Sequence, residues 1–465
     1  MKISTLCCVG AGYVGGPTMA VIAQQCPELK VVVVDQNPDR IAAWNHSDLN
    51  QLPVYEPGLK EIIAEVRNKN LFFSTDIDRG IKEAEMIFMA VNTPTKTTGA
   101  GKGMAADLTH VEACAHKIAA VANGPKIVIE KSTLPVRTAE KIKEVLEQNK
   151  KGFSFEVLSN PEFLAEGTAI ADLYKSDRVL IGGEDTQSGQ AAVNALVSIY
   201  ERWIPREKIL TTNVWSSELS KLASNAMLAQ RISSINSLSA LCEKTGASIE
   251  EVSKAIGMDH RIGDKFLNVS VGFGGSCFQK DILNLVYLSQ TYGLDEVAAY
   301  WLQVIKINDY QKNRFAQRLV ELLPAKIDTP SIALLGWAFK KNTNDSRESA
   351  AIYIAAHLLE KGIQVKVYDP MVTPQRMHMD LKVLFEAQNK SEKQVQELLD
   401  LFHVKKSIDA ALEQTLVAGI ATEWDEFAHF DWKTYLNKCA DTFSLIDGRS
   451  LINREISPKI YSIGN

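Results

Sequence analysis

The stretch Val9-Gly10-Ala11-Gly12-Tyr13-Val14-Gly15 decides the class of fold. An apolar run leads into it, a helical pattern begins near Pro17, and the β-branched run Val31 to Val34 ends at Asp35. A continuous β-branched run is typical of a strand that is buried on both faces of a parallel sheet. Glycines between a strand and a helix let a pyrophosphate approach the backbone at the helix N-terminus. The stretch therefore predicts a doubly wound α/β unit of the Rossmann type that binds a dinucleotide.

Asp35 and Arg40 bear on which dinucleotide is bound. An acid about 20 positions beyond the glycines accepts from the ribose 2′-hydroxyl, and it would repel the 2′-phosphate of NADP. We therefore expect NAD as the cofactor, a preference that the nearby Arg40 weakens slightly. A Rossmann half without a nucleotide is the alternative. The cofactor residues expected here are Gly10, Ala11, Gly12, Tyr13, Val14, Gly15, Asp35 and Arg40.

Composition bounds the function class. The 465 residues suffice for about two to three domains with real cores. The net charge of −5 offers no electrostatic basis for binding nucleic acid or an anionic membrane. No apolar run approaches the ~18 residues of a membrane span, and no signal segment is apparent. The seven cysteines include no C-x-x-C pair, which argues against disulfides and a zinc site. We expect a cytoplasmic protein without a bound metal.

Strand and helix patterns alternate from residue 1 to about residue 213, which predicts an NAD-binding Rossmann domain over 1–213. Turn residues, among them Asn92-Thr93-Pro94, separate the strands. Besides Val31–Val34, the expected strands are Met86–Val91, Lys126–Glu130, Glu156–Leu158 and Val179–Ile181.

A different pattern begins at Trp215. Apolar side chains recur at helical period from 215 to 244 without a proline or glycine, which is long for a globular helix. The start could be capped by Ser216 and Ser217 with Glu218 and Ser220. Further helices are expected over 249–256, 282–291 and 295–323. We expect a central helical and dimerisation domain over 214–325, whose apolar stripe serves packing, in a homodimer or an assembly of dimers.

The α/β pattern returns after Pro330. A strand meets Gly336, a helix follows, and a second strand ends at Asp369, so the order of the N-terminal unit is repeated with one fingerprint glycine. This predicts a second Rossmann-like domain over 326–465, adapted to another ligand. Its first elements are expected at Ile332–Leu335, Ala350–Lys361 and Gln364–Tyr368, and the charged segment Glu386–Lys406 is expected to be a solvated loop or helix insertion.

Cys277 is the most reactive candidate in the chain. It ends the glycine-rich stretch Gly272–Ser276, and a helical pattern follows at once. A thiol near a helix N-terminus is favoured as the thiolate by unpaired N–H groups and the helix dipole. Only the thiolate is a useful nucleophile. The alternative is a small apolar residue that happens to follow a loop.

Other polar residues could complete a site. Lys221 and Asn225 are four apart on one helix face, where they could stabilise an oxyanion; a solvated helix edge is the alternative. Glu162 and Glu166 include a possible general base, or merely form an acidic surface loop. Asp281 lies about one helical turn beyond Cys277. Further cations that could hold phosphates or sugar oxygens, or be merely solvated, are Arg261, Lys340, Arg347 and Arg449.

With these motifs in order, the chain resembles the UDP-glucose/GDP-mannose dehydrogenase family over nearly its full length, most closely the UDP-glucose-oxidising branch of animals and plants. The matching blocks are Val9–Pro17, Val91–Thr95, Glu130–Thr133, Ser159–Ala169, Glu218–Ala226, Arg261–Gly263, Gly272–Asp281, Ala338–Lys341, Asp345–Ser349, Thr422–Phe427 and Asp447–Arg449.

The resemblance implies that the C6 alcohol of UDP-glucose is oxidised to a carboxylate by two NAD molecules in succession. Cys277 would form a thiohemiacetal and then a thioester, which water cleaves. Lys221 and Asn225 would steady the oxyanion. Thr133, Glu162 and Asp281 would position or activate water, with the general base left open.

The resemblance also implies the ligand-binding residues. Arg449 is expected to reach a second subunit's site. Further cofactor residues would be Val91, Asn92, Thr93, Pro94, Thr95, Ser132, Thr133, Glu166 and Arg347. Substrate residues would be Glu162, Phe163, Leu164, Ala165, Glu166, Lys221, Asn225, Arg261, Asn268, Phe273, Gly274, Phe339, Lys340 and Arg449.

The chain departs from the commonest family pattern at Trp337, Asn342 and Asn344, beside Lys340 and Arg347. Two other functions compete with oxidation of UDP-glucose. One is oxidation of GDP-mannose or a UDP-N-acetylhexosamine, which the blocks around Glu162 and Cys277 disfavour. The other is a non-catalytic nucleotide-sensing or scaffold protein, in which we would expect Cys277 or Lys221 to be lost.

Overall fold

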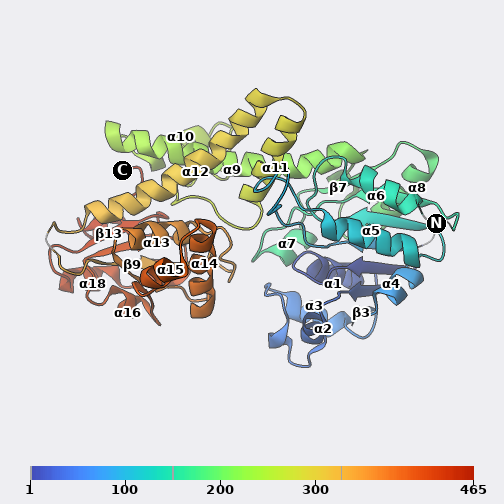
Figure 1. The fold of residues 1–465 in the computed structure, drawn as a ribbon, viewed down its shortest axis with the longest axis horizontal. Coiled ribbons are helices and arrows are strands. Elements are labelled where there is room, and N and C mark those ends of the chain that lie inside the picture. The colour runs from blue at the N-terminus through green and yellow to red at the C-terminus, as the bar shows by residue number, and fades with distance from the viewer. Residues whose placement is uncertain (1–2, 149–150, 326) are drawn as a thin grey trace. The chain divides into compact units, whose positions relative to one another are not determined.

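The structure is a computed structural model that describes residues 3–148, 151–325 and 327–465. The chain divides into two compact units, Met1–Ser224 and Asn225–Asn465. Each unit is built on one sheet covered by helices (Figure 1). The predicted fold class, two Rossmann-like units and a long helix in the middle of the chain, is confirmed.

The first unit contains an eight-stranded sheet in the order β3-β2-β1-β4-β5-β6-β7-β8. Its first six strands are parallel in the order of a doubly wound sheet, while β7 runs antiparallel to β6 and parallel to β8. The strands are β1 (Thr5–Val9), β2 (Lys30–Val34), β3 (Leu71–Ser74), β4 (Met86–Met89), β5 (Lys126–Glu130), β6 (Phe155–Ser159), β7 (Val179–Gly183) and β8 (Ile209–Asn213).

Helices cover both faces of this sheet because its side chains alternate between two apolar cores. Leu6 and Cys8 of β1 belong to one core, and Cys7 and Val9 to the other. The helices of the unit are α1 (Gly15–Gln25), α2 (Pro38–Asn45), α3 (Leu59–Val66), α4 (Ile77–Glu83), α5 (Thr109–Val121), α6 (Thr138–Glu147), α7 (Ala169–Tyr174) and α8 (Gln187–Tyr200), with short 3₁₀ turns η1 (Leu49–Gln51) and η2 (Arg206–Lys208).

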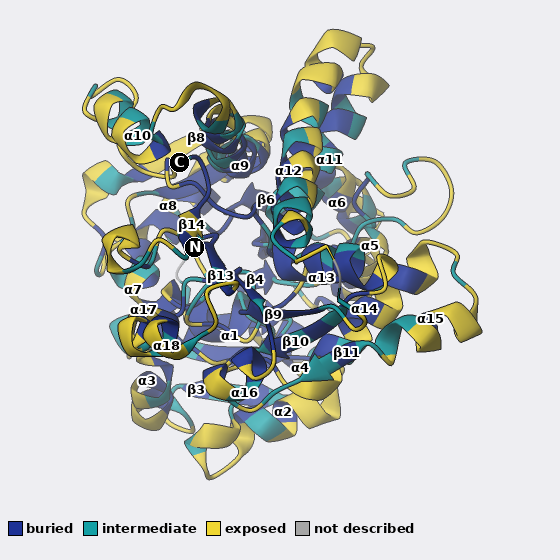
Figure 2. Cartoon of the chain, turned by 90° about the vertical axis from the view of Figure 1, so that its left-hand side faces the viewer, coloured by how far each residue is buried: buried dark blue, intermediate teal, exposed yellow. Residues whose placement is uncertain are grey.

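The second unit contains a six-stranded parallel sheet in the order β11-β10-β9-β12-β13-β14. Its central strand β9 is buried along its whole length, as the dark blue in Figure 2 shows. This order is that of the first six strands of the other unit, so the predicted repeat is real. The strands are β9 (Ser331–Leu335), β10 (Gln364–Tyr368), β11 (Phe402–Val404), β12 (Val417–Ile420), β13 (Ser444–Asp447) and β14 (Ile460–Ser462).

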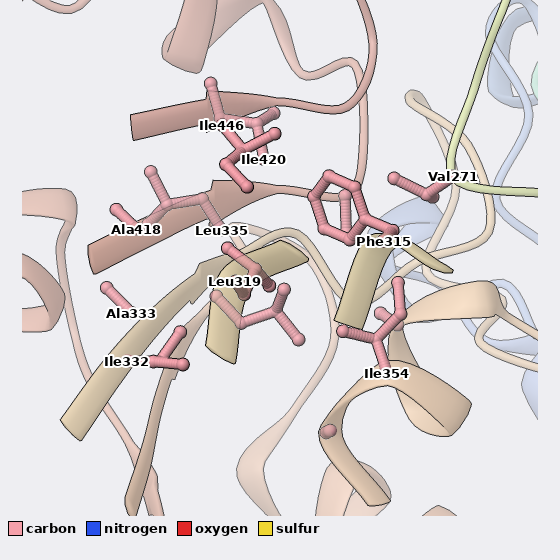
Figure 3. Close-up of a cluster of buried hydrophobic side chains, with 14 of the residues drawn as sticks. Val271, Phe315, Leu319, Ile332, Ala333, Leu335, Ile354, Ala418, Ile420 and Ile446 are labelled. Atoms are coloured by element: carbon pink, nitrogen blue, oxygen red, sulfur yellow. The ribbon is translucent and has the colours of Figure 1, made fainter. Parts of the chain in front are cut away.

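Long helix α12 packs on this second sheet. Phe315 and Leu319 lie against β12, where a Cβ on Gly419 would come within 3.0 Å of Leu319 (Figure 3). The remaining helices are α9 (Val214–Thr245), α10 (Ile249–Gly257), α11 (Phe278–Thr291), α12 (Asp295–Glu321), α13 (Ala350–Glu360), α14 (Pro374–Ala387), α15 (Glu392–Leu399), α16 (Ile408–Leu412), α17 (Asp425–His429) and α18 (Trp432–Lys438), with η3 (Arg454–Ile456).

Helix α9 confirms the predicted long helix, but its start is held differently. Asn213 Oδ1 accepts from the N–H of Ser216 at 2.8 Å and so takes the capping role that we expected of the serines. Ser217 Oγ instead donates to the carbonyl of Ser159. Glu218 accepts from the N–H groups of Arg137 and Ala139 at 2.7 and 2.8 Å. Ser217 therefore fastens the helix to β6 of the first sheet, and Glu218 fastens it to the start of α6.

Two other expectations need correction. The charged segment Glu386–Lys406 contains the expected helix insertion, α15, but it is not a solvated loop, because it also contains the edge strand β11 and because Val395 and Phe402 are buried in the core. A charged sequence hid this strand, which has only three residues. Helix α1 begins at Gly15, before Pro17, and α11 begins at Phe278, four residues earlier than predicted. Among the described helices, none is both long and apolar enough to cross a membrane.

Candidate active site

The fingerprint glycines of the first unit differ in what surrounds them. Gly10 adopts φ +113°, and a Cβ there would lie 2.3 Å from the carbonyl oxygen of Ala90. A Cβ on Gly15 would lie 2.0 Å from the carbonyl oxygen of Gly10. A Cβ on Gly12 would instead enter open space. Packing therefore requires glycine at positions 10 and 15. Gly12 instead leaves room at the N-terminus of α1 for a pyrophosphate, so the turn fits NAD.

Asp35 lies beside this turn, as predicted. It is buried and accepts from the N–H of Ala11 at 2.9 Å. Arg40 Nη1 forms an ion pair with the same carboxylate oxygen at 3.0 Å. Arg40 therefore reduces the negative charge that a 2′-phosphate would meet, but the carboxylate remains an acceptor for a ribose hydroxyl.

Trp44, on α2, holds the turn in place and was not identified from the sequence. Its indole N–H donates to the carbonyl of Ala11 at 2.9 Å, and its ring fills the space where a Cβ on Gly16 would stand. A tryptophan nine residues beyond the acid Asp35 gives no sequence signal, because only the fold brings it to the turn.

The other expected cofactor residues form two linked loops. Ser132 Oγ donates to the carbonyl of Val91 at 2.7 Å. Thr93 Oγ1 donates to the carbonyl of Thr133 at 3.3 Å. The segment Val91–Thr95, which includes Asn92 and Pro94, therefore lies beside the end of β5. Both loops follow the carboxyl ends of neighbouring strands, where ligands bind in doubly wound sheets.

Glu162 and Lys221 form a buried ion pair. Lys221 Nζ lies 3.2 Å from Glu162 Oε1, with side-chain exposures of 5% and 9%. Glu162 Oε2 also accepts from the N–H of Leu164 at 2.8 Å, and Lys221 lies 5.3 Å from the centre of the Phe163 ring. Because neither charge reaches bulk water, removing either partner would leave the other uncompensated. The surface-loop and solvated-edge alternatives are therefore wrong.

Lys131 is a buried lysine close to this pair that sequence reasoning did not single out. Its Nζ donates to Asn160 Oδ1 at 3.1 Å and to the Tyr200 hydroxyl at 3.3 Å. Burial lowers the pKa of Lys131 to about 8, and Glu162 partly opposes that shift. Lys131, Glu162 and Tyr200 line a cavity of about 170 Å³ beneath the 160–164 loop.

Glu56 orders the next part of that loop and also escaped the sequence analysis. Its two carboxylate oxygens accept from the N–H groups of Gly167 and Ala169 at 2.5 and 2.9 Å. The hydroxyl of Tyr13 accepts from the same Gly167 N–H at 3.0 Å. Tyr13 therefore ties the glycine turn to the segment that contains Glu166 and the exposed Ala165. The stretch Tyr55–Gly58 gives no signal that could have revealed Glu56, because the burial of an acid cannot be read from the sequence.

Glu130 and Glu218 are a buried pair of carboxyl groups. Glu218 already accepts two backbone N–H groups, and the carboxyl group of Glu130 is buried beside it. Two ionised carboxylates can only accept and repel each other, which favours a proton on one of them. Burial raises the pKa of Glu130 well above its usual range, and the charge of Glu218 raises it further. The nearby cations are engaged elsewhere, Lys131 with Asn160, Lys221 with Glu162 and Arg137 with Glu140.

The second unit contains the remaining candidate catalytic residues. Cys277 is the N-cap residue of α11, half-buried, with Ser276 Oγ 3.5 Å from its Sγ. Asp281 is buried one turn later, and Asn225 Nδ2 donates to its Oδ2 at 2.6 Å. Asn225 follows Lys221 by one turn of the continuous helix α9.

The glycine turn of the second sheet is closed to a ribose. Gly336 has φ +100°, and a Cβ there would lie 2.4 Å from Thr422. Asp369 takes the place that Asp35 has in the first unit. Its carboxylate accepts from the backbone N–H groups of Trp337, Ala338, Met371 and Val372 and from the indole of Trp424. Five donors saturate it, which supports the prediction that this unit takes another ligand.

The expected substrate residues of the second unit divide into buried and exposed groups. Phe273 is buried, whereas Asn268 is exposed and Gly274 half-buried. Lys340 lies 5.6 Å from the centre of the Phe339 ring. Three arginines are paired within the unit, Arg261 with Asp259, Arg347 with Asp345 and Arg449 with Glu423. Within the described ranges, no group of three His, Cys, Asp or Glu residues could hold a metal ion.

Comparison with protein families accounts for both units. Residues 4–204, 215–310 and 333–454 match the NAD binding, central and UDP binding domains of the UDP-glucose/GDP-mannose dehydrogenase family. The chain belongs to this family. The NAD binding match contains the glycine turn, Asp35 and the Glu162 loop, so these dehydrogenase features lie in the domain that takes NAD.

Individual relatives support the assignment to this dehydrogenase family. UDP-glucose 6-dehydrogenase of Mus musculus is 55% identical over 97% of this chain and 90% of its own length. UDP-glucose 6-dehydrogenase 4 of Arabidopsis thaliana is 53% identical over 99% and 96%. A solved UDP-glucose dehydrogenase of Pyrobaculum islandicum has a TM-score of 0.83 at 29% identity and covers 100% of this chain and 98% of its own.

The Asp35–Arg40 pair predicts cofactor preference in this dehydrogenase. We expect kcat/KM with NAD to exceed that with NADP by a wide margin, since a 2′-phosphate would meet the Asp35 carboxylate. Asp35→Asn should narrow the margin by about tenfold (~1.4 kcal/mol), as measured by initial rates with each cofactor. Asp39→Asn, an exposed change on the same helix, is the control. Equal efficiency of the wild type with both cofactors would remove Asp35 from the site.

The Glu130–Glu218 pair predicts a pH-dependent stability. The folded protein retains a proton that the unfolded chain releases above a carboxyl pKa of 4.5, so stability should fall as pH rises from that value toward the raised pKa. Glu130→Gln, whose amide still donates to Glu218, should reduce proton uptake on folding by about one proton. Melting temperatures from pH 5 to 8 measure this slope. The exposed Glu144→Gln on α6 should leave the slope unchanged, and an unchanged slope in Glu130→Gln would refute proton sharing.

Proposed function

We propose that the protein oxidises the C6 alcohol of UDP-glucose to a carboxylate in two NAD-dependent steps, with Cys277 as the covalent nucleophile. The observation that carries this proposal is the position of Cys277 as N-cap of α11 in a chain that matches all three family domains. The relatives named UDP-glucose 6-dehydrogenase, at 53% and 55% identity, support the choice of substrate. NAD would supply the hydride acceptor for both oxidations.

The role of Cys277 follows from the C6 aldehyde that the first oxidation forms, which must stay bound until the second oxidation. The positive end of the α11 helix dipole favours the thiolate. The thiolate attacks the C6 aldehyde carbon, a C–S bond forms, and the carbonyl electron pair moves to oxygen as the thiohemiacetal. After the second oxidation the group is a thioester. Water then attacks the acyl carbon, the C–S bond breaks, and the thiol is released with the carboxylate product.

Lys221 and Asn225 would stabilise the negative charge that develops on the C6 oxygen. The ammonium of Lys221 is held by Glu162 at 3.2 Å in a buried setting, where a positive charge acts far more strongly than in water. Asn225 donates to Asp281 at 2.6 Å, which orients its amide. A charge and a dipole fixed before substrate arrives need no reorganisation in the transition state.

Water activation is assigned to three residues. Glu162 and Asp281 are buried carboxyl groups held by Lys221 and Asn225 respectively. Thr133 lies on the loop tied to Thr93. We propose that these residues position the hydrolytic water and that one of the two carboxylates takes its proton.

Binding of the nucleotide sugar is proposed for the two units in turn. Phe163, Leu164, Ala165 and Glu166 would contact the sugar from the first unit. UDP would lie against residues of the UDP binding match, Phe339 and Lys340, and against Arg261, Asn268, Phe273 and Gly274. Arg449 would contact the substrate bound to a second subunit. Glu166 and Arg347 would contact NAD.

We propose a homodimer or an assembly of dimers located in the cytoplasm. Helix α9 carries exposed Met227, Leu238 and Leu241, and α12 carries exposed Val297 and Tyr300. Exposed apolar side chains on long helices support an interface. We also propose the division into domains 1–213, 214–325 and 326–465, in which the helices α9 to α12 form a domain between the two that contain the sheets.

The first experiment tests substrate and nucleophile together. Wild-type protein with NAD and UDP-glucose should form two NADH per UDP-glucose, and it should act far more slowly on GDP-mannose and UDP-N-acetylhexosamines. Cys277→Ser should lower steady-state turnover by more than about 10³-fold, as loss of a covalent nucleophile does elsewhere. Absorbance of NADH measures both.

Cys439→Ser is the matched control, since Cys439 is also a half-buried thiol of the second unit. It should retain wild-type turnover. Wild-type turnover by Cys277→Ser would exclude the covalent route, whereas failure of the wild type to oxidise any nucleotide sugar would exclude the proposed function.

Lys221 tests the oxyanion role. Lys221→Ala should lower kcat by about 10²–10³-fold and change KM for UDP-glucose far less. Asn225→Ala should act in the same direction but more weakly, because a neutral donor is worth less than a charged one. Steady-state kinetics separate the two constants. The control is Lys244→Ala, an exposed lysine of the same helix. A raised KM with an unchanged kcat would show that Lys221 only grips the ground state.

A further inference from the structure

The segment between α10 and Cys277 is buried without forming a helix or strand. Leu267, Val269, Val271 and Phe273 are all buried, and residues 267–274 have no regular secondary structure. Val271 lies beside Phe315 of α12 in the apolar core (Figure 3). A buried irregular backbone has no ladder to satisfy its N–H and C=O groups, so side chains must satisfy them.

Three buried amide side chains from two helices do so. Asn236 of α9 accepts from the N–H of Ser270 at 2.9 Å, and Gln311 of α12 donates to the carbonyl of Ser270 at 2.6 Å. Asn308 of α12 accepts from the N–H of Phe273 at 2.8 Å and donates to its carbonyl at 3.0 Å. Asn308 thus pairs with Phe273 as a neighbouring strand would.

The fit around these amides leaves little freedom. A Cβ on Gly272, which has φ +127°, would lie 2.9 Å from Asn308 Oδ1. A Cβ on Gly274 would lie 2.5 Å from the carbonyl oxygen of Glu348, and one on Gly448 would lie 2.3 Å from Val271. The segment is therefore held from α9, from α12 and from the second sheet.

Burying three amide side chains in a core has a desolvation penalty that apolar side chains would not have. Each must lose its water before it gains a partner, and Gln311 Oε1 has no partner among the described residues. Leucine has the same number of side-chain heavy atoms as asparagine and carries no polar group that must lose its water. Among the described residues, these amide side chains hydrogen-bond to Ser270 and Phe273, and Phe273 stands four residues before Cys277.

We propose that Asn236, Asn308 and Gln311 are positioning residues that set the backbone course of segment 267–274 and so preorganise the binding of the uridine diphosphate moiety. The inference rests on the proposed function, because Asn268, Phe273 and Gly274 are the substrate residues proposed there. The amides touch no reacting atom and act through the segment.

The experiment measures two ligands on one protein. Asn308→Leu should weaken UDP binding by about tenfold or more (~1.4 kcal/mol), because the segment loses its preorganised course. NAD affinity should stay within about twofold of wild type, since NAD binds to the first unit. Titration calorimetry with UDP and with NAD gives both values. Hydrogen–deuterium exchange of the 267–274 peptide should rise.

Two further variants keep the test decisive. Asn313→Leu, an exposed change on the same helix α12, should leave UDP binding and exchange unchanged. Asn236→Ser is a milder change on α9 that should also weaken UDP binding. This variant replaces Asn308→Leu in the test if Asn308→Leu does not fold.

The outcomes separate the two proposals. A folded Asn308→Leu or Asn236→Ser protein with wild-type affinity for UDP would overturn the positioning role, whatever its melting temperature. An equal loss of UDP and NAD affinity would also overturn it, as general destabilisation. A wild-type protein that binds no UDP would overturn the proposed function and this inference together. Wild-type protein that binds UDP but oxidises no sugar would overturn only the proposed function.

Discussion

The close approach of neighbouring strands at Gly10 and Gly336 is the constraint on which both units depend. In each unit the glycine N–H donates to the end of the second strand at 2.8 Å, and a Cβ would lie 2.3 or 2.4 Å from an atom that follows the fourth strand. No other residue type fits at either position. The chain can therefore turn sharply at the carboxyl end of the sheet, which opens the crevice where α/β proteins bind ligands. The acid at the end of the second strand is used differently in the two units. Asp35 keeps an acceptor for a ribose, while Asp369 is saturated by backbone N–H groups and the Trp424 indole.

Helix α9 converts this scaffold into a candidate active site. Its first turns are fastened to β6 by Ser217 and to the start of α6 by Glu218, and the next turn carries Lys221. Glu130, Glu162 and Lys131 lie around it, all buried. A buried ion pair adds little net stability, because the loss of hydration opposes the attraction between the charges. Removing one partner is nevertheless destabilising by about 3–5 kcal/mol, because the other charge stays buried and unpaired. The concentration of these buried charged groups at one helix start is consistent with the proposed electrostatic preorganisation for a developing negative charge.

The second unit meets a different physical problem with the same means. An irregular segment is buried beside Cys277, and the amides of Asn236, Asn308 and Gln311 supply the partners that regular structure would supply elsewhere. In both units, buried polar side chains hold a loop that carries candidate ligand contacts. Glu56, in the segment that precedes α3, does this for the loop around Glu166. Such interactions are expensive in a core and are retained where position matters more than stability.

The sequence by itself determined the two-sheet architecture, the long helix and the family, because glycine turns, β-branched runs and helical periods are local signals that tertiary packing reinforced. It also determined that Asp35 and Cys277 stand at element ends. Only the tertiary structure decided that Lys221 pairs with Glu162, that Glu130 meets Glu218, and that Trp44, Glu56 and Lys131 belong to the site. Those residues lie tens of positions apart and carry no spacing pattern, so they meet only where strands end along one edge of a sheet. Strand β11 was missed because burial, which the chain cannot show locally, overrode local propensity. The cap at Asn213 was missed because α9 begins at Val214, one residue before the expected start.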